Sequence, residues 1–249
     1  MSDSIVLQAS NIVKELGQGA GKVCALKGVS LTLEPGQLTL LMGPSGSGKT
    51  TLLSILGCIL TPTSGSITVA GHVADGLDPE ELAHLRRRHI GFVFQTYNLF
   101  PTLTAEENVR LALDVRGEGR KPAIQMARRA LTSVGLAHKL KSYPRNMSGG
   151  EQQRVAIARA LAGSPSVILA DEPTAALDSE NGQAVMGLLA EIAHRENRAV
   201  LAVTHDPRTL NFADRIVRIE DGLIVGEKRQ RSKHSVGVGE PIRKIRANA

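Results

Sequence analysis

The sequence of 249 residues contains little cysteine and few aromatic residues. Its two cysteines, Cys24 and Cys58, are too few for a disulfide framework and lack the paired spacing of a zinc site. Aromatic residues make up 2% of the chain and Trp is absent, which argues against the stacking surfaces that bind single-stranded nucleic acid. We therefore expect a protein of the reducing cytoplasm with no nucleic-acid partner.

The sequence also lacks a long apolar run. No stretch of about 18 apolar residues occurs, and the N-terminus has no basic segment followed by an apolar one. From these absences we expect the chain to have no membrane-spanning segment and no secretory signal peptide.

The positive charge is confined to one end of the chain. The net charge is +6, and residues 228–249 account for all of it with seven Lys or Arg and one acid. We expect residues 1–227 to fold as one domain and residues 228–249 to form a flexible basic tail. Two interpretations of the tail stay open, a solvated segment or one that contacts anionic lipid headgroups or an acidic protein loop.

Strand patterns of two kinds occur. Short β-branched runs between turn-forming residues, typical of antiparallel strands, lie at residues 5–10, 28–33 and 66–70. Almost entirely apolar runs, typical of parallel strands covered on both faces, lie at residues 38–42, 91–94, 167–170 and 199–203. Helical spacing and a T-x-x-E capping box at Thr104 and Glu107 indicate helices between the second and third of these runs. We expect an α/β core with an N-terminal antiparallel β subdomain and an inserted α-helical subdomain at about 97–160.

A glycine-rich loop matching G-x-x-x-x-G-K-[ST] follows the apolar run 38–42. Glycines let consecutive backbone N–H groups turn toward phosphate oxygens, and the next helix presents its positive dipole end to them. A ligand-free Gly/Ser turn is disfavoured because a strand and an apolar helix flank the loop in the required order. The motif predicts a P-loop NTPase (RecA-like) core that binds ATP and Mg²⁺, with Lys49 on the β- and γ-phosphates and Thr50 on the metal. The residues expected to bind nucleotide are Gly43, Pro44, Ser45, Gly46, Ser47, Gly48, Lys49, Thr50 and Thr51.

Three polar residues follow predicted parallel strands at their carboxyl ends, where ligands gather in open α/β sheets. Asp171 and Glu172 end the run 167–170, and alternation along a strand points them in different directions. We expect Asp171 to hold the magnesium shell, Glu172 to polarise the attacking water, and His205 to contact the γ-phosphate. The competing interpretations are solvated acids at a strand end and a structural histidine.

A second cluster of glycines, Ser148-Gly149-Gly150-Glu151, precedes the helical run 155–161. Glycines at a helix start expose N–H groups, which makes another anion site. At this point the sequence resembles the ABC ATPases, whose signature is LSGGQ, over about residues 5–226. The resemblance identifies Gln95 with the Q-loop, Asp171 and Glu172 with the Walker B pair, Asp178 with the D-loop and His205 with the switch histidine. It implies that Thr50, Gln95 and Asp171 hold Mg²⁺, and that Lys49, Gln95, Glu172 and His205 are catalytic.

The resemblance also implies the partners. Two ABC ATPase domains pack head to tail, and the signature of one completes the ATP site of the other. A second copy of this chain would therefore place Ser148, Gly149, Gly150, Glu151 and Asp178 against the nucleotide. The family implies ATP hydrolysis coupled to an integral membrane permease, with the ATPase cytoplasmic and peripheral on the inner face of the plasma membrane.

The segment 91–109 resembles the branch of macrolide-efflux, lipoprotein-release and cell-division ATPases. This branch implies export, or lipoprotein or lipid extraction, through a separate permease whose coupling helices sit in a groove near the Q-loop. The groove residues would be Tyr97, Leu99, Phe100 and Leu103, although these apolar residues also suit packing within the helical subdomain. The alternatives are a non-transport ABC ATPase acting on nucleic acid or ribosomes and a P-loop kinase of small metabolites, which would not need the second glycine cluster.

The sequence departs from the family pattern in three places. Cys24 stands where many members have an aromatic that stacks on adenine, so the base would lose stacking of about 1 kcal/mol. Glu151 replaces the signature Gln and forms an S-x-x-E capping box with Ser148, which makes a purely local role in starting the helix an equal alternative. Met147 replaces Leu with little change in volume.

Overall fold

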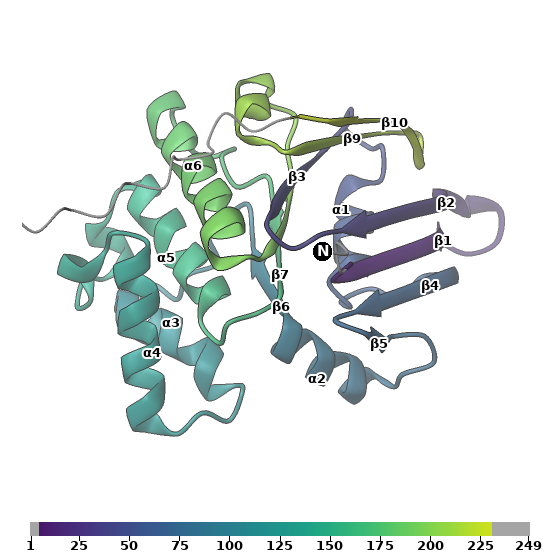
Figure 1. Ribbon diagram of the computed structural model, residues 1–249. Coiled ribbons are helices and arrows are strands. Elements are labelled where there is room, and N and C mark those ends of the chain that lie inside the picture. Colours follow the sequence, from purple (N-terminus) through teal and green to yellow (C-terminus); the bar gives the residue numbers. More distant parts are fainter. Residues whose placement is uncertain (1–4, 231–249) are drawn as a thin grey trace, which may run out of the picture.

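The structure is a computed structural model that describes residues 5–230. It contains two β-sheets of different character (Figure 1). The first sheet is antiparallel, with the strand order β2-β1-β4-β5. Its strands are β1 (Leu7–Leu16), β2 (Val23–Leu33), β4 (Ser64–Val69) and β5 (His72–Val73). The N-terminal antiparallel subdomain predicted from the β-branched runs is confirmed, with longer strands than the runs themselves.

The second sheet has the order β10-β9-β3-β8-β7-β6. All its neighbours pair in parallel except β10, which is antiparallel to β9. The strands are β3 (Gln37–Met42), β6 (Ile90–Val93), β7 (Val167–Asp171), β8 (Ala199–Val203), β9 (Arg215–Glu220) and β10 (Leu223–Arg229). The four apolar runs therefore form the parallel core as predicted, whereas the hairpin of β9 and β10 was missed.

Helices cover this second sheet and extend away from it (Figure 1). The α-helices are α1 (Lys49–Leu56), α2 (Pro79–His89), α3 (Ala105–Asp114), α4 (Arg120–Ser133), α5 (Gly149–Leu161) and α6 (Ser179–Glu196). Short 3₁₀ turns occupy Gly19–Gly21, Ala137–Lys139, Pro144–Asn146 and Pro207–Phe212. Helices α3, α4 and α5 gather on the side opposite the antiparallel sheet, which agrees with an inserted helical subdomain.

Alternation along the parallel strands divides the core in two. Leu38 and Leu40 of β3 pack in the cluster that includes the helical subdomain and α6, whereas Leu41 packs with α1 and the antiparallel sheet. Both faces of the strand are buried, so each of these leucines contributes about 1.5–3 kcal/mol through burial. The core thus holds the carboxyl ends of the strands, where the polar residues lie, in fixed positions.

Local signals set two further boundaries. The Thr104–Glu107 capping box is present, since Thr104 N donates to Glu107 Oε2 at 2.8 Å and Glu107 N to Thr104 Oγ1 at 3.3 Å. At the other end β10 runs to Arg229, two residues into the segment expected as a tail, and Arg229 pairs with Glu34 at 2.8 Å. The rest of the expected tail, 231–249, lies outside the described residues. Within residues 5–230, no helix is both long and apolar enough to cross a bilayer.

Candidate functional site

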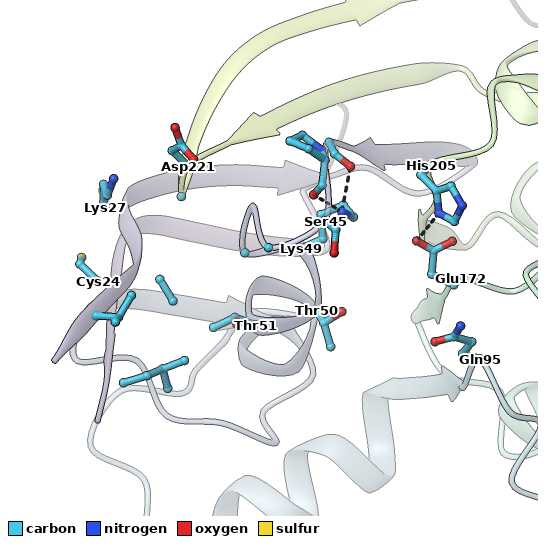
Figure 2. Close-up of a pocket in the computed structure, with 18 residues that line it drawn as sticks. Cys24, Lys27, Ser45, Lys49, Thr50, Thr51, Gln95, Glu172, His205 and Asp221 are labelled. Atoms are coloured by element: carbon cyan, nitrogen blue, oxygen red, sulfur yellow. Dashed lines mark hydrogen bonds and ion pairs between the residues drawn. The ribbon is translucent and has the colours of Figure 1, made fainter. Parts of the chain in front are cut away.

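A cavity of about 830 Å³ lies beside the glycine-rich loop and the polar residues that follow β7 and β8 (Figure 2). The lining residues come from distant parts of the chain, which the two sheets bring to one place. Of the sequence-predicted residues, those in its lining are Cys24, Gly43, Pro44, Ser45, Gly46, Gly48, Lys49, Thr50, Thr51, Gln95, Glu172 and His205.

The loop between β3 and α1 has the backbone of a phosphate cradle. Gly46 and Gly48 adopt φ of +79° and +98°, which turns successive N–H groups to one side. Gly48 caps α1 without any side-chain hydrogen bond, and a Cβ there would lie 2.7 Å from Ala25 O. Ser47, which the sequence also predicted to bind nucleotide, is buried and does not belong to the lining of the cavity. These features fit a bound phosphate.

Lys49 closes the loop on itself. Its Nζ donates to Gly43 O at 2.8 Å and to Pro44 O at 2.7 Å, while the residue lines the cavity. An ammonium group has three donors, so one more is available for a phosphate oxygen. Lys49 therefore keeps one donor for the phosphate contact that the sequence predicts.

Thr50 and Asp171 bring two hard oxygen ligands together. Thr50 Oγ1 lies 3.5 Å from Asp171 Oδ1, at the outer limit of a hydrogen bond, and Thr50 faces the cavity with Gln95. Burial raises the pKa of Asp171, with a smaller contribution from the negative charge of Glu172, while Thr50 and Lys49 oppose the rise. Oxygen ligands of this kind are those that Mg²⁺ prefers, and a cation here would favour the ionised carboxylate. The residues present fit the metal.

Glu172 and His205 meet across two neighbouring parallel strands. Glu172 follows β7 with φ of +46°, and its N–H donates to Val203 O at 3.0 Å. Its Oε1 lies 2.9 Å from His205 Nδ1, and Figure 2 shows the two side chains pointing toward each other across the cavity from Lys49. The carboxylate is largely buried and the imidazole is exposed. The pair can hold and orient a water molecule beside the terminal phosphate.

Cys24, Lys27 and Asp221 lie at the end of the cavity away from Glu172 and His205 (Figure 2). Cys24 lines it beside Val23 and Leu16, whose exposed fractions are 63% and 42%. Cys24 Sγ donates to Leu26 O at 3.1 Å. Two exposed aliphatic side chains thus lie beside Cys24, and none of the residues that line this cavity is aromatic except His205.

The hairpin of β9 and β10 supports the loop, and sequence reasoning missed it. Gly222 N donates to Ser47 O at 3.1 Å and Lys27 N donates to Gly222 O at 2.9 Å. Lys27, Asp221 and Gly222 all line the cavity. The dipeptide Asp221-Gly222 between two β-branched runs is the standard signal of a hairpin turn and marked this element.

The second glycine cluster lies at the start of α5, apart from the cavity. Ser148 caps the helix in a capping box with Glu151, with Glu151 N donating to Ser148 Oγ at 3.2 Å and Ser148 N to Glu151 Oε2 at 2.9 Å. Lys139 pairs with Glu151 at 3.2 Å. The hydrogen bond from Ser148 and, to a smaller extent, Lys139 lower the pKa of Glu151. The side chain has the local role that the sequence allowed.

The other predicted partner-site residues also stay outside the cavity. Asp178 caps α6, where its Oδ1 accepts from Asn181 N at 2.9 Å. Neither Asp178 nor any residue of the 148–151 cluster belongs to the lining of the large cavity. The structure of one chain therefore brings the P-loop, Gln95, Glu172 and His205 together and leaves the signature elsewhere.

The residues expected to form a docking groove differ in how far their side chains are exposed. Leu99 packs against the core cluster of the helical subdomain, whereas Phe100 is 51% exposed. Asn108 holds the segment between them and α3, since its side chain bonds Phe100 N at 2.8 Å and Leu103 O at 3.0 Å. Packing explains Leu99, and packing alone does not explain the exposed ring of Phe100.

Comparison with known proteins settles the family. The model of the ABC transporter family matches residues 26–175, the stretch that holds the P-loop, Gln95, the signature and both Walker B acids. The chain belongs to the ABC transporter family. The resemblance seen in the sequence is confirmed, and so are the P-loop NTPase fold and the activity, ATP hydrolysis by an ATP-binding cassette.

Individual relatives of this ABC cassette are close in sequence. The macrolide export ATP-binding/permease protein MacB of Bradyrhizobium diazoefficiens is 45% identical over 224 residues, 90% of this chain and 34% of the relative. MacB of Salmonella typhimurium is 44% identical over 238 residues, 95% of this chain and 37% of the relative. The chain thus spans about a third of the length of these relatives. A solved structure titled as a dimeric post-hydrolysis state of the ATP-binding cassette MJ0796 bound to ADP and Pi matches with a TM-score of 0.82 at 41% identity, covering 90% of this chain and 99% of that one.

Proposed function

We propose that the chain is the ATPase subunit of an ABC transporter and that it works as a dimer closed around ATP. The observation that carries this proposal is the separation of two glycine-rich helix starts in one chain, the P-loop at the cavity and the start of α5 outside it. The cavity of one chain contains no residue of the signature, and the signature of the same chain lies outside that cavity. A second copy in head-to-tail orientation supplies both, and the neighbour MJ0796, titled as dimeric, supports that arrangement.

In this proposal the residues around the cavity have separate tasks. The loop amides and Lys49 bind the phosphates and stabilise the charge that develops during transfer. Glu172 orients the attacking water, and His205 at 2.9 Å keeps the carboxylate in place and contacts the γ-phosphate. Thr50, Asp171 and Gln95 would hold Mg²⁺, which neutralises charge on the phosphate oxygens. ATP bound between two copies favours the closed dimer, and hydrolysis removes that preference, which provides a mechanical cycle.

The variant Glu172→Gln tests the dimer. We expect it to bind ATP, to hydrolyse it at least about 100-fold more slowly, and to accumulate as a dimer in light scattering with ATP and not with ADP. The matched control Glu172→Gln with Ser148→Arg places a bulky cation at the signature. This double variant should bind ATP equally well and remain a monomer. Wild-type turnover in Glu172→Gln contradicts the proposal. The single variant Ser148→Arg, which keeps Glu172, should be monomeric and inactive, and hydrolysis at full rate by that monomer would also contradict the proposal.

A membrane permease is the proposed partner of the dimer. The relatives named above are ATP-binding/permease proteins for macrolide export, so we infer export, or extraction of lipoprotein or lipid, from the inner face of the membrane. The half-exposed Phe100, with Tyr97, Leu99 and Leu103, is the proposed contact. Phe100→Ser should keep basal ATPase activity but no longer bind the permease in detergent-solubilised membranes. Tyr143→Ser, which changes another exposed aromatic residue, should keep both the activity and the binding. Association that survives Phe100→Ser contradicts the contact.

The basic tail is a separate proposal, contact with anionic lipid headgroups. Residues 231–249 carry five Lys or Arg and one acid, whereas Lys228 and Arg229 belong to β10 and must be kept in a truncation. Deletion of residues 231–249 should weaken sedimentation with vesicles containing phosphatidylserine at low salt. Binding of the full chain should fall as salt rises, because the attraction is screened beyond about 10 Å at 0.1 M. Binding to neutral vesicles at equal strength contradicts this role.

A further inference from the structure

Arg159 of α5 reaches across to the segment that follows Gln95. Its Nη2 donates to Tyr97 O at 2.7 Å, and its Nη1 donates to Asn98 O. Burial lowers the pKa of Arg159, and no ion pair of this residue occurs among the described residues. The guanidinium of this partly buried arginine thus bonds two backbone carbonyls and no carboxylate among the described residues.

The backbone that Arg159 holds is strained. Tyr97 and Asn98 have φ of +53° and +48°, so two consecutive residues other than glycine lie in the left-handed region. A residue of this kind persists only where the surroundings over-determine it, at about 1–3 kcal/mol each. The two carbonyls bonded to Arg159 belong to these two residues, and Thr96 Oγ1 bonds Asn98 Oδ1 at 3.0 Å. Arg159 thus bonds both residues of this left-handed turn.

The same turn touches the other end of α5. A Cβ added to Gly149, the first residue of α5, would lie 2.9 Å from Tyr97 Oη. Arg159 is ten residues further along the helix, about 15 Å from its start. Helix α5 therefore bonds the segment after Gln95 through Arg159 and lies against the Tyr97 side chain at Gly149, where the signature begins.

We propose that Arg159 is a positioning residue for ATP hydrolysis, holding the Tyr97–Asn98 turn so that Gln95 in the cavity and the signature start of α5 move as one body. The inference rests on the proposed function, since both groups must meet nucleotide for their relation to matter. Arginine suits the task because its planar fork bonds two carbonyls at once, whereas a lysine ammonium is a single point of attachment. In this proposal Arg159 does not itself contact the reacting atoms.

Kinetics of Arg159→Met test the role. We expect kcat to fall about 10-fold or more, because a misplacement of about 1 Å at Gln95 is costly. The affinity for ADP, measured by titration calorimetry, should stay within about 2-fold, since the P-loop is untouched. Arg159→Lys should recover part of kcat. Arg129→Met, which removes an exposed arginine of α4, is the matched control and should leave kcat unchanged.

A spectroscopic measurement separates positioning from stability. The chain has two tyrosines and no Trp, so Tyr143→Phe makes Tyr97 the one strong emitter. In that background Arg159→Met should lower the fluorescence anisotropy of Tyr97 at a temperature where both variants are fully folded. Unchanged anisotropy, or a kcat that falls only with the folded fraction, overturns the inference. If Arg159→Met does not fold, Arg159→Lys is read by the same two criteria.

The outcome for Arg159 is independent of the dimer test. A full kcat in Arg159→Met together with ATP-dependent dimers of Glu172→Gln removes this inference and leaves the proposed function standing. Absence of those dimers in Glu172→Gln removes the proposed function itself.

Discussion

Two glycine-rich helix starts in this chain differ in how their backbone N–H groups are used. At α1, Gly48 has φ of +98° and the helix has neither a side-chain cap nor an acid in its first turn. At α5, Ser148 caps the helix with φ of −64°, and Glu151 in its first turn closes a capping box. The first start leaves donors for a ligand, and the second satisfies part of its own.

The difference shows that two helix starts of similar composition leave different numbers of backbone donors unsatisfied. The N-terminus of α1 carries its full dipole to the cavity, where a phosphate can take up the donors. The N-terminus of α5 is already partly neutralised by Glu151, and Lys139 in turn pairs with that acid at 3.2 Å. We infer that α1 provides most of the nucleotide affinity of one chain, whereas α5 adds its share only when a second copy presents the nucleotide.

Gly48→Ala should produce the largest effect on this comparison. The new Cβ would meet Ala25 O at 2.7 Å at a left-handed position, so we expect ADP affinity to fall about 100-fold or more. Titration calorimetry measures the change. Gly46→Ala is the control. Its φ is also left-handed, at +79°, but no atom lies within 4 Å of the added Cβ, so this variant measures the effect of backbone strain without a steric clash.

The corresponding change at the other start is Gly150→Ala. Its Cβ would meet Asn181 Oδ1 at 2.5 Å, the end of a side chain that can move. ADP affinity of the monomer should therefore stay unchanged, while ATP-driven dimerisation in the Glu172→Gln background weakens. Loss of ADP binding in Gly150→Ala would show that both starts serve the same nucleotide in one chain.

Cys24→Tyr sharpens the comparison at the base end of the first site. A ring beside Val23 and Leu16 adds stacking of about 1 kcal/mol, so ATP affinity should rise about 5-fold. Cys24→Ser adds no ring and should leave the affinity unchanged. Equal or weaker ATP binding by Cys24→Tyr would mean that the base rests on another part of the cavity.

The sequence predicted those parts of the site that depend on local spacing. The loop before α1, the capping boxes at Thr104 and Ser148, and the polar residues after β7 and β8 were all placed correctly, because a motif or a strand end determines each of them. The carboxyl-edge rule placed Glu172 and His205 at the same edge of the sheet, whereas their contact at 2.9 Å was not predicted.

Contacts between distant segments escaped the sequence. Arg159 bonds a turn 62 residues before it. The Asp221-Gly222 turn, far along the chain from the P-loop, bonds it next to the pairing of β9 with β3. No periodicity encodes such a pair, since its geometry depends on how two subdomains pack. The strained φ of Tyr97 and Asn98 was likewise invisible, because neither residue is a glycine that would mark the turn.

The smallest predicted effect concerns the acid that distinguishes the two starts. The capping bond from Ser148 N and, to a smaller extent, Lys139 hold the pKa of Glu151 below its usual value, so the ionised carboxylate is favoured in the folded state. Its contribution to stability is therefore present above the unfolded pKa of about 4.3 and is lost as pH falls through the lower folded pKa. Glu151→Gln keeps the box and loses the charge, so its melting temperature should lie slightly below wild type at pH 7 and approach it at pH 3 in calorimetry.

With Glu172→Gln added, the neutral side chain should also strengthen ATP-driven dimerisation at pH 7 by about 2-fold, since an acid beside a phosphate is unfavourable. Glu118→Gln, an exposed acid beyond α3 with no ion pair among the described residues, is the control and should show neither trend. A difference between Glu151→Gln and wild type that grows toward low pH would assign the carboxylate the opposite sign and remove the distinction between the two helix starts.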